Sequence, residues 1–357
     1  MKKKFLAAVM GAAMVINISP VITFAETAAD NETVAATEAV PDTGADDASA
    51  GEPADNAQET SARVEITDQT SLEAAIAQGG AIDLTGKTIT LERPLTVNSS
   101  VTITGGTLVG TAGVGYNNLV TLSGDEVTLD GVTIITASEN KSALHAYRTV
   151  LTANNLTIDH TNAAGGAPVI INGGSAVFTG NLDLKLGMNS WYGVNVDNAS
   201  ADFSGASITK IDTPLATQSV VCAENGGSVP GKVKVANTTE VVTADGQTAY
   251  VQDEDLPGFL KAKKANDVVS VTLLHDVELS EPLYLEEQMT VNGQGFYFNG
   301  TAAIGKDNVV TVMAGESDVV SLNDLGIRTD AANKSALHIY KSRAALKNIT
   351  LDNTNTA

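Results

Sequence analysis

Short runs in which apolar and polar residues alternate recur along the sequence at a nearly constant interval. One series of runs begins at Val101, Val127, Val150, Ala176 and Ala201. Each run places β-branched or aliphatic residues at about every second position and is broken by Gly, Asn, Asp or Ser. Alternation with a period of two is typical of half-buried β-strands, and such polar residues mark the corners between strands. The pattern predicts a β-solenoid with about 25 residues in each turn.

A second series of runs indicates which side chains face the interior. Its starts, Asn117, Ser142, Ala167 and Tyr192, are evenly spaced at this same regular interval. The spacing predicts two inward columns, Leu119/Leu144/Val169/Val194 and Thr121/Ala146/Ile171/Val196. The intervening column is expected to point outward because neighbouring side chains of a strand alternate between faces, and it consists of Val120, His145, Ile170 and Asn195. His145 is therefore predicted to be exposed.

The next turn departs from this spacing, because the regular interval places polar Ser219 in the first inward column. One extra corner residue brings Val220 and Cys222 inward instead, and we prefer this longer step. Cys222 is then a buried small apolar side chain rather than a reactive thiol. It is the only cysteine of the chain, so no internal disulfide can form.

Two segments have the pattern of short helices that cover a solenoid. The segment Thr70–Gly80, TSLEAAIAQGG, combines a possible capping box of Thr70 and Glu73 with an amphipathic run and terminal glycines. It predicts a brief α-helix over the first turn. A second capping segment is predicted around Phe259–Ala262.

A longer duplication contains these turns. The segment Val127–Ala164 aligns without a gap to Val320–Ala357, and the octapeptide NKSALHAY at Asn140–Tyr147 returns as NKSALHIY at Asn333–Tyr340. We predict two tandem solenoid domains, residues 63–247 and 248–357, of which the second is incomplete. A solenoid that stops in mid-stack exposes a strand edge, so we expect the native chain to be longer.

The N-terminal residues have the composition of export and linker segments. Residues 1–25 combine three lysines with a short apolar run and end in ITFA, which predicts a signal peptide. Residues 26–62 hold ten acidic residues and no basic ones, which predicts a disordered acidic linker. We therefore expect a protein that is secreted or on the cell surface, without a transmembrane segment and with an unidentified mode of envelope attachment. The net charge of −21 disfavours nucleic acid as a partner.

The sequence also resembles a known family. The similarity lies in the opening SLEAAIAQGGAIDLTGKTITLERPLTVNSSVTITGG, in VTLDGVTI, and in GMNSWYGVNVDN at Gly187–Asn198. These segments resemble the pectate-lyase-like adhesive domains of bacterial surface proteins, which belong to the pectin-lyase-like right-handed parallel β-helix superfamily. The resemblance covers about residues 63–357 and implies three strands per turn, right-handed coiling and a surface location. The expected fold is all-β, with a short N-terminal α-helical cap and two tandem β-helices.

The superfamily includes lyases, hydrolases, adhesins and toxins, so the function depends on the residues of the site. A lyase needs a base and acidic ligands for a cation, and a hydrolase needs two carboxylates roughly 5–9 Å apart. The aspartates of the strands have no acidic neighbour at the expected interval, since Asp130 faces Asn154, Asp159 faces Leu184 and Asp197 faces Asn172. His160 and His275 also lack partners at metal-ligand spacing. We predict no catalytic residue, metal or cofactor.

Six side chains are candidates for ligand binding: His145, Tyr147, Trp191, Tyr192, His338 and Tyr340. Imidazole and aromatic groups can stack on sugars and form hydrogen bonds with them. The alternatives are that the His-x-Tyr pairs only decorate a strand and that Trp191 folds over the next turn, and we favour these structural interpretations.

The main functional hypothesis is a non-enzymatic, adhesin-like protein that binds a glycan or an extracellular protein. A carbohydrate-active β-helix enzyme, either a polysaccharide lyase or a glycoside hydrolase, is the alternative. A purely structural module is the third possibility.

Overall fold

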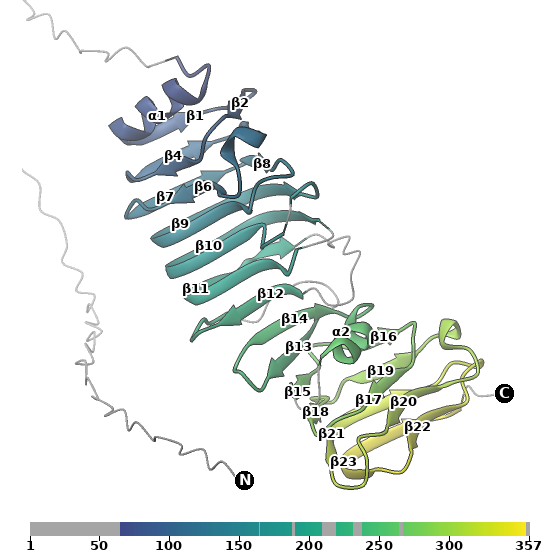
Figure 1. The fold of residues 1–357 in the computed structure, drawn as a ribbon. Helices are drawn as coiled ribbons and strands as arrows, with labels where there is room; N and C mark the ends of the chain where they lie inside the picture. The colour runs from purple at the N-terminus through teal and green to yellow at the C-terminus, as the bar shows by residue number, and fades with distance from the viewer. Residues whose placement is uncertain are drawn as a thin grey trace, which may run out of the picture. The chain divides into compact units, whose positions relative to one another are not determined.

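The computed structural model describes residues 65–354 except 164, 188–189, 209–218, 231–237 and 264–266. The described residues form a mostly parallel β-solenoid of about 10 turns with few helices (Figure 1). The predicted signal peptide, residues 1–25, and the predicted acidic linker, residues 26–62, lie outside the described residues.

The first turns consist of short strands that stack in parallel. They are β1 (Gly80–Asp83), β2 (Thr88–Leu91), β3 (Leu95–Val97), β4 (Val101–Thr104), β5 (Thr107–Gly110), β6 (Asn118–Leu122), β7 (Glu126–Asp130) and β8 (Thr133–Ile135). Every third strand pairs, so β1, β4 and β7 form one stack, β2, β5 and β8 a second, and β3 and β6 a third. Each turn here therefore contributes three strands.

The middle turns have longer strands that continue through the corners: β9 (Ser142–His160), β10 (Val169–Leu186) and β11 (Tyr192–Ile208). Strand β9 pairs in parallel with β6, β7 and β8 in succession, and β10 and β11 extend this stack (Figure 1). Corner residues Asn155 and Asn198 have φ values of 49° and 48°. Asparagine tolerates this left-handed conformation better than most residues, which suits it to these bends.

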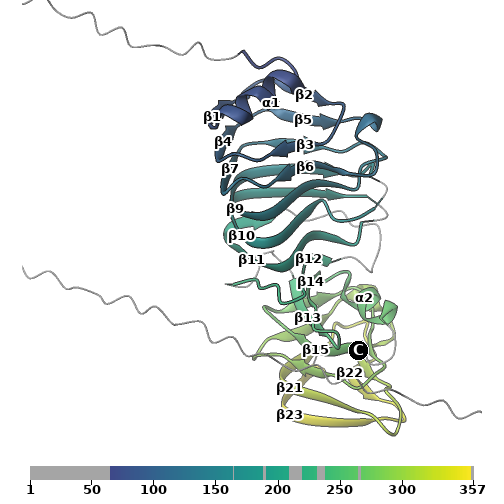
Figure 2. The ribbon, with the colours of Figure 1, turned by 60° about the vertical axis from the view of Figure 1, so that its left-hand side comes forward.

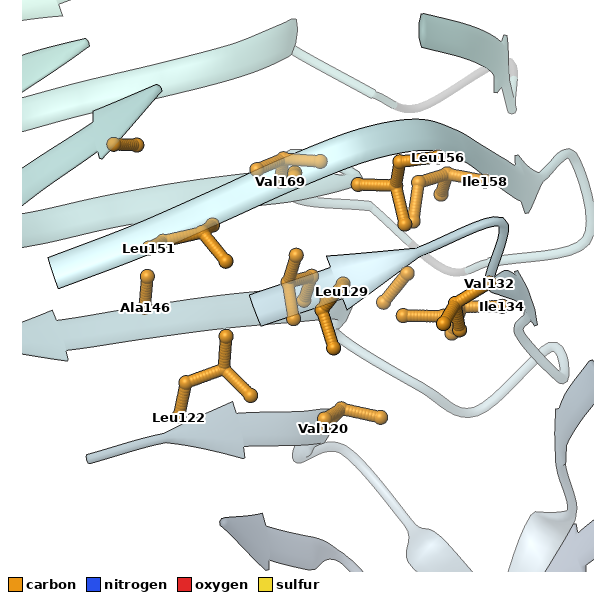
Figure 3. Close-up of a cluster of buried hydrophobic side chains, with 14 of the residues drawn as sticks. Val120, Leu122, Leu129, Val132, Ile134, Ala146, Leu151, Leu156, Ile158 and Val169 are labelled. Atoms are coloured by element: carbon orange, nitrogen blue, oxygen red, sulfur yellow. The ribbon is translucent and has the colours of Figure 1, made fainter. Parts of the chain in front are cut away.

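The register corrects the expected inward columns at β6. Val120 pairs with Leu144 and Leu122 pairs with Ala146, so the step between these turns is one residue shorter than the regular interval. The prediction that Val120 points outward and that Thr121 belongs to an inward column is wrong. A slip of one residue would place polar Thr121 in the interior, and the observed register buries two aliphatic side chains instead. Figure 3 shows Val120 and Leu122 in the interior with Ala146.

The next departure lies between β11 and β12 (Ser219–Glu224). Val194 pairs with Val221 and Asn195 with Cys222, so this step exceeds the regular interval by two residues, whereas we preferred an excess of one. Cys222 therefore belongs to the outward column, contrary to the prediction. It is nevertheless buried, as predicted, because an antiparallel strand pairs with this edge of the stack and places Ala249 opposite it.

That antiparallel strand is β14 (Thr248–Gln252), which forms a hairpin with β13 (Thr238–Thr243). Side chains of β14 alternate between two buried clusters, because Tyr250 packs into the first and Ala249 and Val251 into the second. The hairpin thus interrupts the parallel stacking and supplies apolar residues to both clusters. The predicted boundary between residues 247 and 248 falls where the hairpin turn meets β14, and it stays a prediction.

Parallel stacking resumes after the hairpin. The strands are β15 (Val268–Thr272), β16 (Val277–Leu279), β17 (Leu283–Leu285), β18 (Thr290–Asn292), β19 (Tyr297–Gly300), β20 (Asn308–Val312), β21 (Val319–Arg328), β22 (Ser335–Ile339) and β23 (Arg343–Asp352). On the last turn, Ile339, Leu346 and Leu351 pair with buried Val312, Leu322 and Ile327 but are 41%, 48% and 51% exposed. These three side chains lie on the last strands that the structure describes.

Two short helices lie where the sequence predicts capping segments. Helix α1 (Gln69–Gln78) buries Leu72 and Ile76 and contacts β1, β2 and β3 (Figure 2). Its N-cap is Asp68, which forms a capping box with Ser71, so the predicted capping pair of Thr70 and Glu73 is wrong. Helix α2 (Leu256–Ala262) begins three residues before the predicted segment Phe259–Ala262. Among the described residues, neither helix nor any other is long and apolar enough to cross a bilayer.

Candidate ligand-binding site

The repeated octapeptide begins with an asparagine that ties its turn to the preceding one. Asn140 is buried; its side-chain oxygen accepts from the Ala137 amide at 2.8 Å, and its amide group donates to the Thr111 and Gly115 carbonyls at 3.2 and 3.4 Å. The second occurrence forms the equivalent bonds: the Asn333 oxygen accepts from the Asp330 amide, and the Asn333 amide group donates to the Thr301 and Gly305 carbonyls. The asparagine is therefore a structural tie in both occurrences.

The residues that lie opposite these asparagines, and the serines that follow them, also have structural roles. A methyl group at Gly110 would overlap the Asn140 oxygen, and one at Gly300 would overlap the Asn333 oxygen, so both ties require a glycine opposite them. The following serines repeat as well. Ser142 donates to Asn118 at 2.6 Å, and Ser335 donates to Asn308 at 2.6 Å.

His145 follows these structural positions and points outward between Thr121 and Ile170. It is half-buried rather than fully exposed, since the Asn118 amide lies 3.0 Å from its Nδ1. The Asn118 amide nitrogen can only donate, and its oxygen already accepts from Ser142, so Nδ1 accepts and the neutral ring carries its hydrogen on Nε2. Burial, and then the nearby positive charge of Lys141, lower the pKa of His145. The uncharged ring is thus favoured.

Tyr147 and Tyr340 have almost the same surroundings. The His145 and Tyr147 rings are 5.7 Å apart, and the Arg148 guanidinium lies 5.1 Å from the Tyr147 ring centroid. In the second occurrence, His338 and Tyr340 are 5.8 Å apart, and the Lys341 ammonium lies 5.2 Å from the ring. Tyr147 is 39% exposed and Tyr340 is 48% exposed. Each octapeptide therefore ends in an exposed tyrosine between a histidine and a cation.

Trp191 and Tyr192 have different environments. Trp191 is 66% exposed, so the expectation that it folds over the next turn is wrong. Tyr192 is half-buried, and its hydroxyl group interacts with the Cys222 thiol. Burial raises the pKa of Tyr192, and burial likewise raises the pKa of Cys222 to about 12. Trp191 is thus exposed to solvent, whereas Tyr192 is half-buried beside the buried Cys222.

A pair of carboxylates on neighbouring turns was missed by the sequence prediction. Asp197 and Glu224 occupy paired positions on β11 and β12. Each of their four oxygens accepts a hydrogen bond from a side-chain amide, the donors being Asn172 (2.6 Å), Asn225 (2.8 Å), Asn195 (2.7 Å) and Gln247 (3.2 Å). The long step into β12 concealed this pair, because the regular interval does not align the two residues. The four bonds link this pair to neighbouring side chains of the stack, and each oxygen retains a second acceptor position.

Of the neighbours predicted for the other two aspartates, one is confirmed and one is wrong. Asp130 lies beside Asn154 and accepts from its amide at 2.7 Å, as the spacing predicts. Asp159 pairs with Lys185 at 3.4 Å, whereas the sequence interval predicted Leu184. The difference is one extra residue within β10, where the register shifts between Thr179 and Leu182. A positive charge therefore neutralises Asp159.

The remaining histidines have structural partners. His160 is fully buried between the Thr136 hydroxyl and the Gly165 carbonyl, at 3.2 and 3.0 Å, and burial lowers its pKa to about 4. His275 lies 3.6 Å from buried Asp253, which is too far for a hydrogen bond. Burial raises the pKa of Asp253 to about 6. Within the described part of the chain, no group of three or more His, Cys, Asp or Glu residues is placed to hold a metal ion.

A pocket beside α2 was also missed by the sequence prediction. It has a volume of about 290 Å³, and its lining includes Pro257, Lys261, Glu281, Tyr284, Glu286 and Met313. Helix α2 contacts β17 here, so the shape of the pocket depends on how the helix lies across the outward-facing side of that strand. The only signal in the sequence is a tyrosine between two apolar strand positions, Leu283 and Leu285.

No family model matches the chain, and neither the curated proteins nor the solved structures contain a match.

Proposed function

We propose that the protein is a secreted or cell-surface binding protein of the pectate-lyase-like adhesive class. Its scaffold is a right-handed parallel β-helix in two tandem copies, and its partners are glycans or proteins of a host, a matrix or a neighbouring cell. The protein acts by binding and not by catalysis.

The observation that supports binding is the repeated exposed tyrosine. Tyr147 and Tyr340 each lie at a strand corner with a histidine on one side and a cation on the other. An aromatic face offers apolar contact to a ligand, and the hydroxyl and imidazole groups offer hydrogen bonds. At Tyr147 the buried residues Leu144 and Ala146 fix the backbone beneath the ring, so little conformational entropy is lost when a ligand binds there.

The carboxylate pair favours binding over hydrolysis. A glycosidase needs one carboxyl group that gives a proton and a second that attacks the sugar or activates water. Asp197 and Glu224 instead each accept two hydrogen bonds from side-chain amides, most of them on neighbouring turns, as expected of carboxylates that link strands of the stack. This arrangement supports a structural role for the pair.

The tandem organisation is supported by the matching ties of the two octapeptides. The bonds of Asn140 and Asn333 agree in their acceptors and donors, and so do those of Ser142 and Ser335. Matching geometry at aligned residues is expected when one structural unit has been duplicated. The right-handed coiling follows from the family resemblance.

The test combines binding and activity measurements. The purified protein is applied to arrays of glycans and matrix proteins and is separately incubated with pectins, alginates and glycosaminoglycans, with and without Ca²⁺. Saturable binding to an array member together with no cleavage is the expected result. Cleavage of any polysaccharide would instead establish an enzyme, and neither binding nor cleavage would indicate a purely structural module.

A further inference from the structure

The pocket beside α2, here called the α2 pocket, has the size of a small-molecule subsite. Its volume of about 290 Å³ lies near the lower end of the roughly 300–1,000 Å³ found for ligand pockets. A single sugar ring or a single side chain fits such a volume. Its lining mixes apolar groups, such as Pro257 and Met313, with charged ones.

The walls of the α2 pocket are held in place by buried residues. Helix α2 buries Leu256, Phe259 and Leu260, with Pro257 in its first turn. On the opposite wall, Leu283 and Leu285 flank Tyr284 and are fully buried, while Tyr284 is 41% exposed. The tyrosine ring is therefore presented at the surface by a rigid strand. Such preorganisation lowers the entropic cost of binding.

The charged groups of the α2 pocket are not paired with one another. Lys261 offers only hydrogen-bond donors, whereas Glu281 and Glu286 offer only acceptors. Within the described residues, none of these three side chains forms an ion pair or a hydrogen bond. Their bonding capacity is therefore free for a ligand.

This combination of groups selects the chemistry of the ligand. The lining carries charges of both signs, so a ligand of either charge meets at least one like charge, whereas a neutral ligand meets none. A neutral sugar has hydroxyl groups that donate to the carboxylates and accept from the ammonium, and its C–H face can lie on the Tyr284 ring. We propose that the α2 pocket binds a neutral sugar residue of a glycan. This inference rests on the proposed function, since it takes an extracellular glycan as the ligand.

The outward column of the same strands extends the α2 pocket toward the repeated tyrosine. Tyr284 pairs with Thr311, and Thr311 pairs with His338. Neighbouring strands lie about 4.8 Å apart, so Tyr284 and His338 are separated by roughly 10 Å along the stack. Val312 and Ile339 are paired, and Met313 and Tyr340 are the next residues on these two neighbouring turns. A glycan of several residues can therefore reach from the α2 pocket to Tyr340.

The first octapeptide region indicates which substitution of Tyr284 the scaffold can accommodate. Its outward column is Thr96, Thr121 and His145, so threonine stands where the second region has Tyr284. Tyr284→Thr therefore introduces a residue that this scaffold already accommodates at the equivalent position. Tyr116→Thr is the control, because Tyr116 is 63% exposed and does not line the α2 pocket.

The probes are immobilised neutral oligosaccharides of glucose, galactose, mannose, N-acetylglucosamine and N-acetylgalactosamine, with heparin and oligolysine as charged probes. The unmodified protein is expected to bind at least one neutral probe. Tyr284→Thr should weaken that binding at least about tenfold, as expected for a central aromatic contact, whereas Tyr116→Thr should leave it unchanged. Glu286→Gln keeps an acceptor and should change the affinity less than about threefold. Unfolding temperatures should agree among all variants.

Several results would overturn the inference. If Tyr284→Thr binds the neutral probe as well as the unmodified protein does, the α2 pocket is not the site, although the proposed function stands. Binding to matrix proteins alone would lead to the same conclusion. Binding to oligolysine that is lost in Glu286→Gln would assign a cationic ligand to the α2 pocket. If the protein binds no glycan and no matrix protein, both the inference and the proposed function fail.

Discussion

The two octapeptide regions share their structural residues and differ in their outward ones. Asn140 and Asn333 form equivalent ties, and both occurrences place the leucine of the octapeptide in an inward column. The outward column, however, begins with Thr96 in the first region and with Tyr284 in the second. Stacking therefore constrains the inward and tying positions, while the outward positions are free to acquire ligand contacts.

The regions also differ in how their inward residues are covered. Leu144 is fully buried because β10 stacks on β9, whereas Leu337 lies on the last described turn and is only partly buried. The same sequence motif thus contributes different amounts of buried apolar area. This difference gives the largest expected effect among the tests that follow.

The first prediction compares Leu144→Ala with Leu337→Ala. Removing a fully buried leucine costs about 2–5 kcal/mol of unfolding free energy, because it loses apolar contacts and leaves a cavity. At the partly covered position, Leu337→Ala should cost about 1 kcal/mol, since less area leaves contact. Urea denaturation followed by circular dichroism measures both values. Equal losses in the two variants would contradict the assigned burial.

The second prediction concerns His160, which aligns with exposed Asn353 in the second region. The folded-state pKa of His160 is about 4, below its ordinary value of 6.5, so its contribution to stability is complete above pH 6.5 and is lost as pH falls toward 4. The loss is at most about 3 kcal/mol. His160→Asn should abolish this loss of stability at acidic pH, as measured by urea denaturation at several pH values.

Asp253 provides a control of opposite sign. Its folded-state pKa is about 6, above the ordinary value of 3.8, so its contribution is present below pH 3.8 and is lost as pH rises through 6. The neighbouring His275, 3.6 Å away, opposes this shift when it is charged. Asp253→Asn should therefore remove the fall in unfolding free energy that accompanies a rise in pH through 6. Parallel changes in both variants would refute these assignments.

The third prediction tests the shared ties. Asn140→Ala and Asn333→Ala each remove a buried side chain that makes three hydrogen bonds, and each leaves backbone groups without partners. We expect a loss of about 2 kcal/mol in unfolding free energy for either variant. Thermal or urea unfolding measures the change. A loss confined to one variant would show that the two ties are not equivalent.

The smallest effect is expected at the cations beside the exposed tyrosines. Arg148→Ala and Lys341→Ala each remove a solvent-exposed cation–π contact, which contributes about 0.5 kcal/mol. Stability, measured by urea denaturation, should therefore change very little in either region. A loss above about 2 kcal/mol would show that these residues belong to the scaffold rather than to its outer surface.

The periodicity of the sequence was sufficient to predict the solenoid and most of its inward residues. Leu144, Val169 and Val194 lie in one buried column, as the regular interval predicts. The errors lie where a corner gains or loses residues, which shortens the step after β6 and lengthens the step into β12. Corner residues contribute little to the apolar pattern, so an insertion there leaves no signal until the register is known.

The site was less predictable because it depends on contacts between turns. Asp197 and Glu224 meet only through the long step into β12, and the α2 pocket forms only where α2 crosses β17. The exposure of Trp191 likewise depends on the path of its corner, which a single aromatic residue in the sequence does not specify. His145 and Tyr147 could be placed on the outer face because strand alternation alone determines their direction.

The most direct test of the division between scaffold and outer surface is a paired measurement on Tyr284→Thr. Its unfolding curve and its affinity for an immobilised neutral oligosaccharide are compared with those of the unmodified protein. An unchanged unfolding curve with binding weakened at least about tenfold is the predicted result. Unchanged binding, or weaker binding accompanied by a large loss of stability, would contradict it.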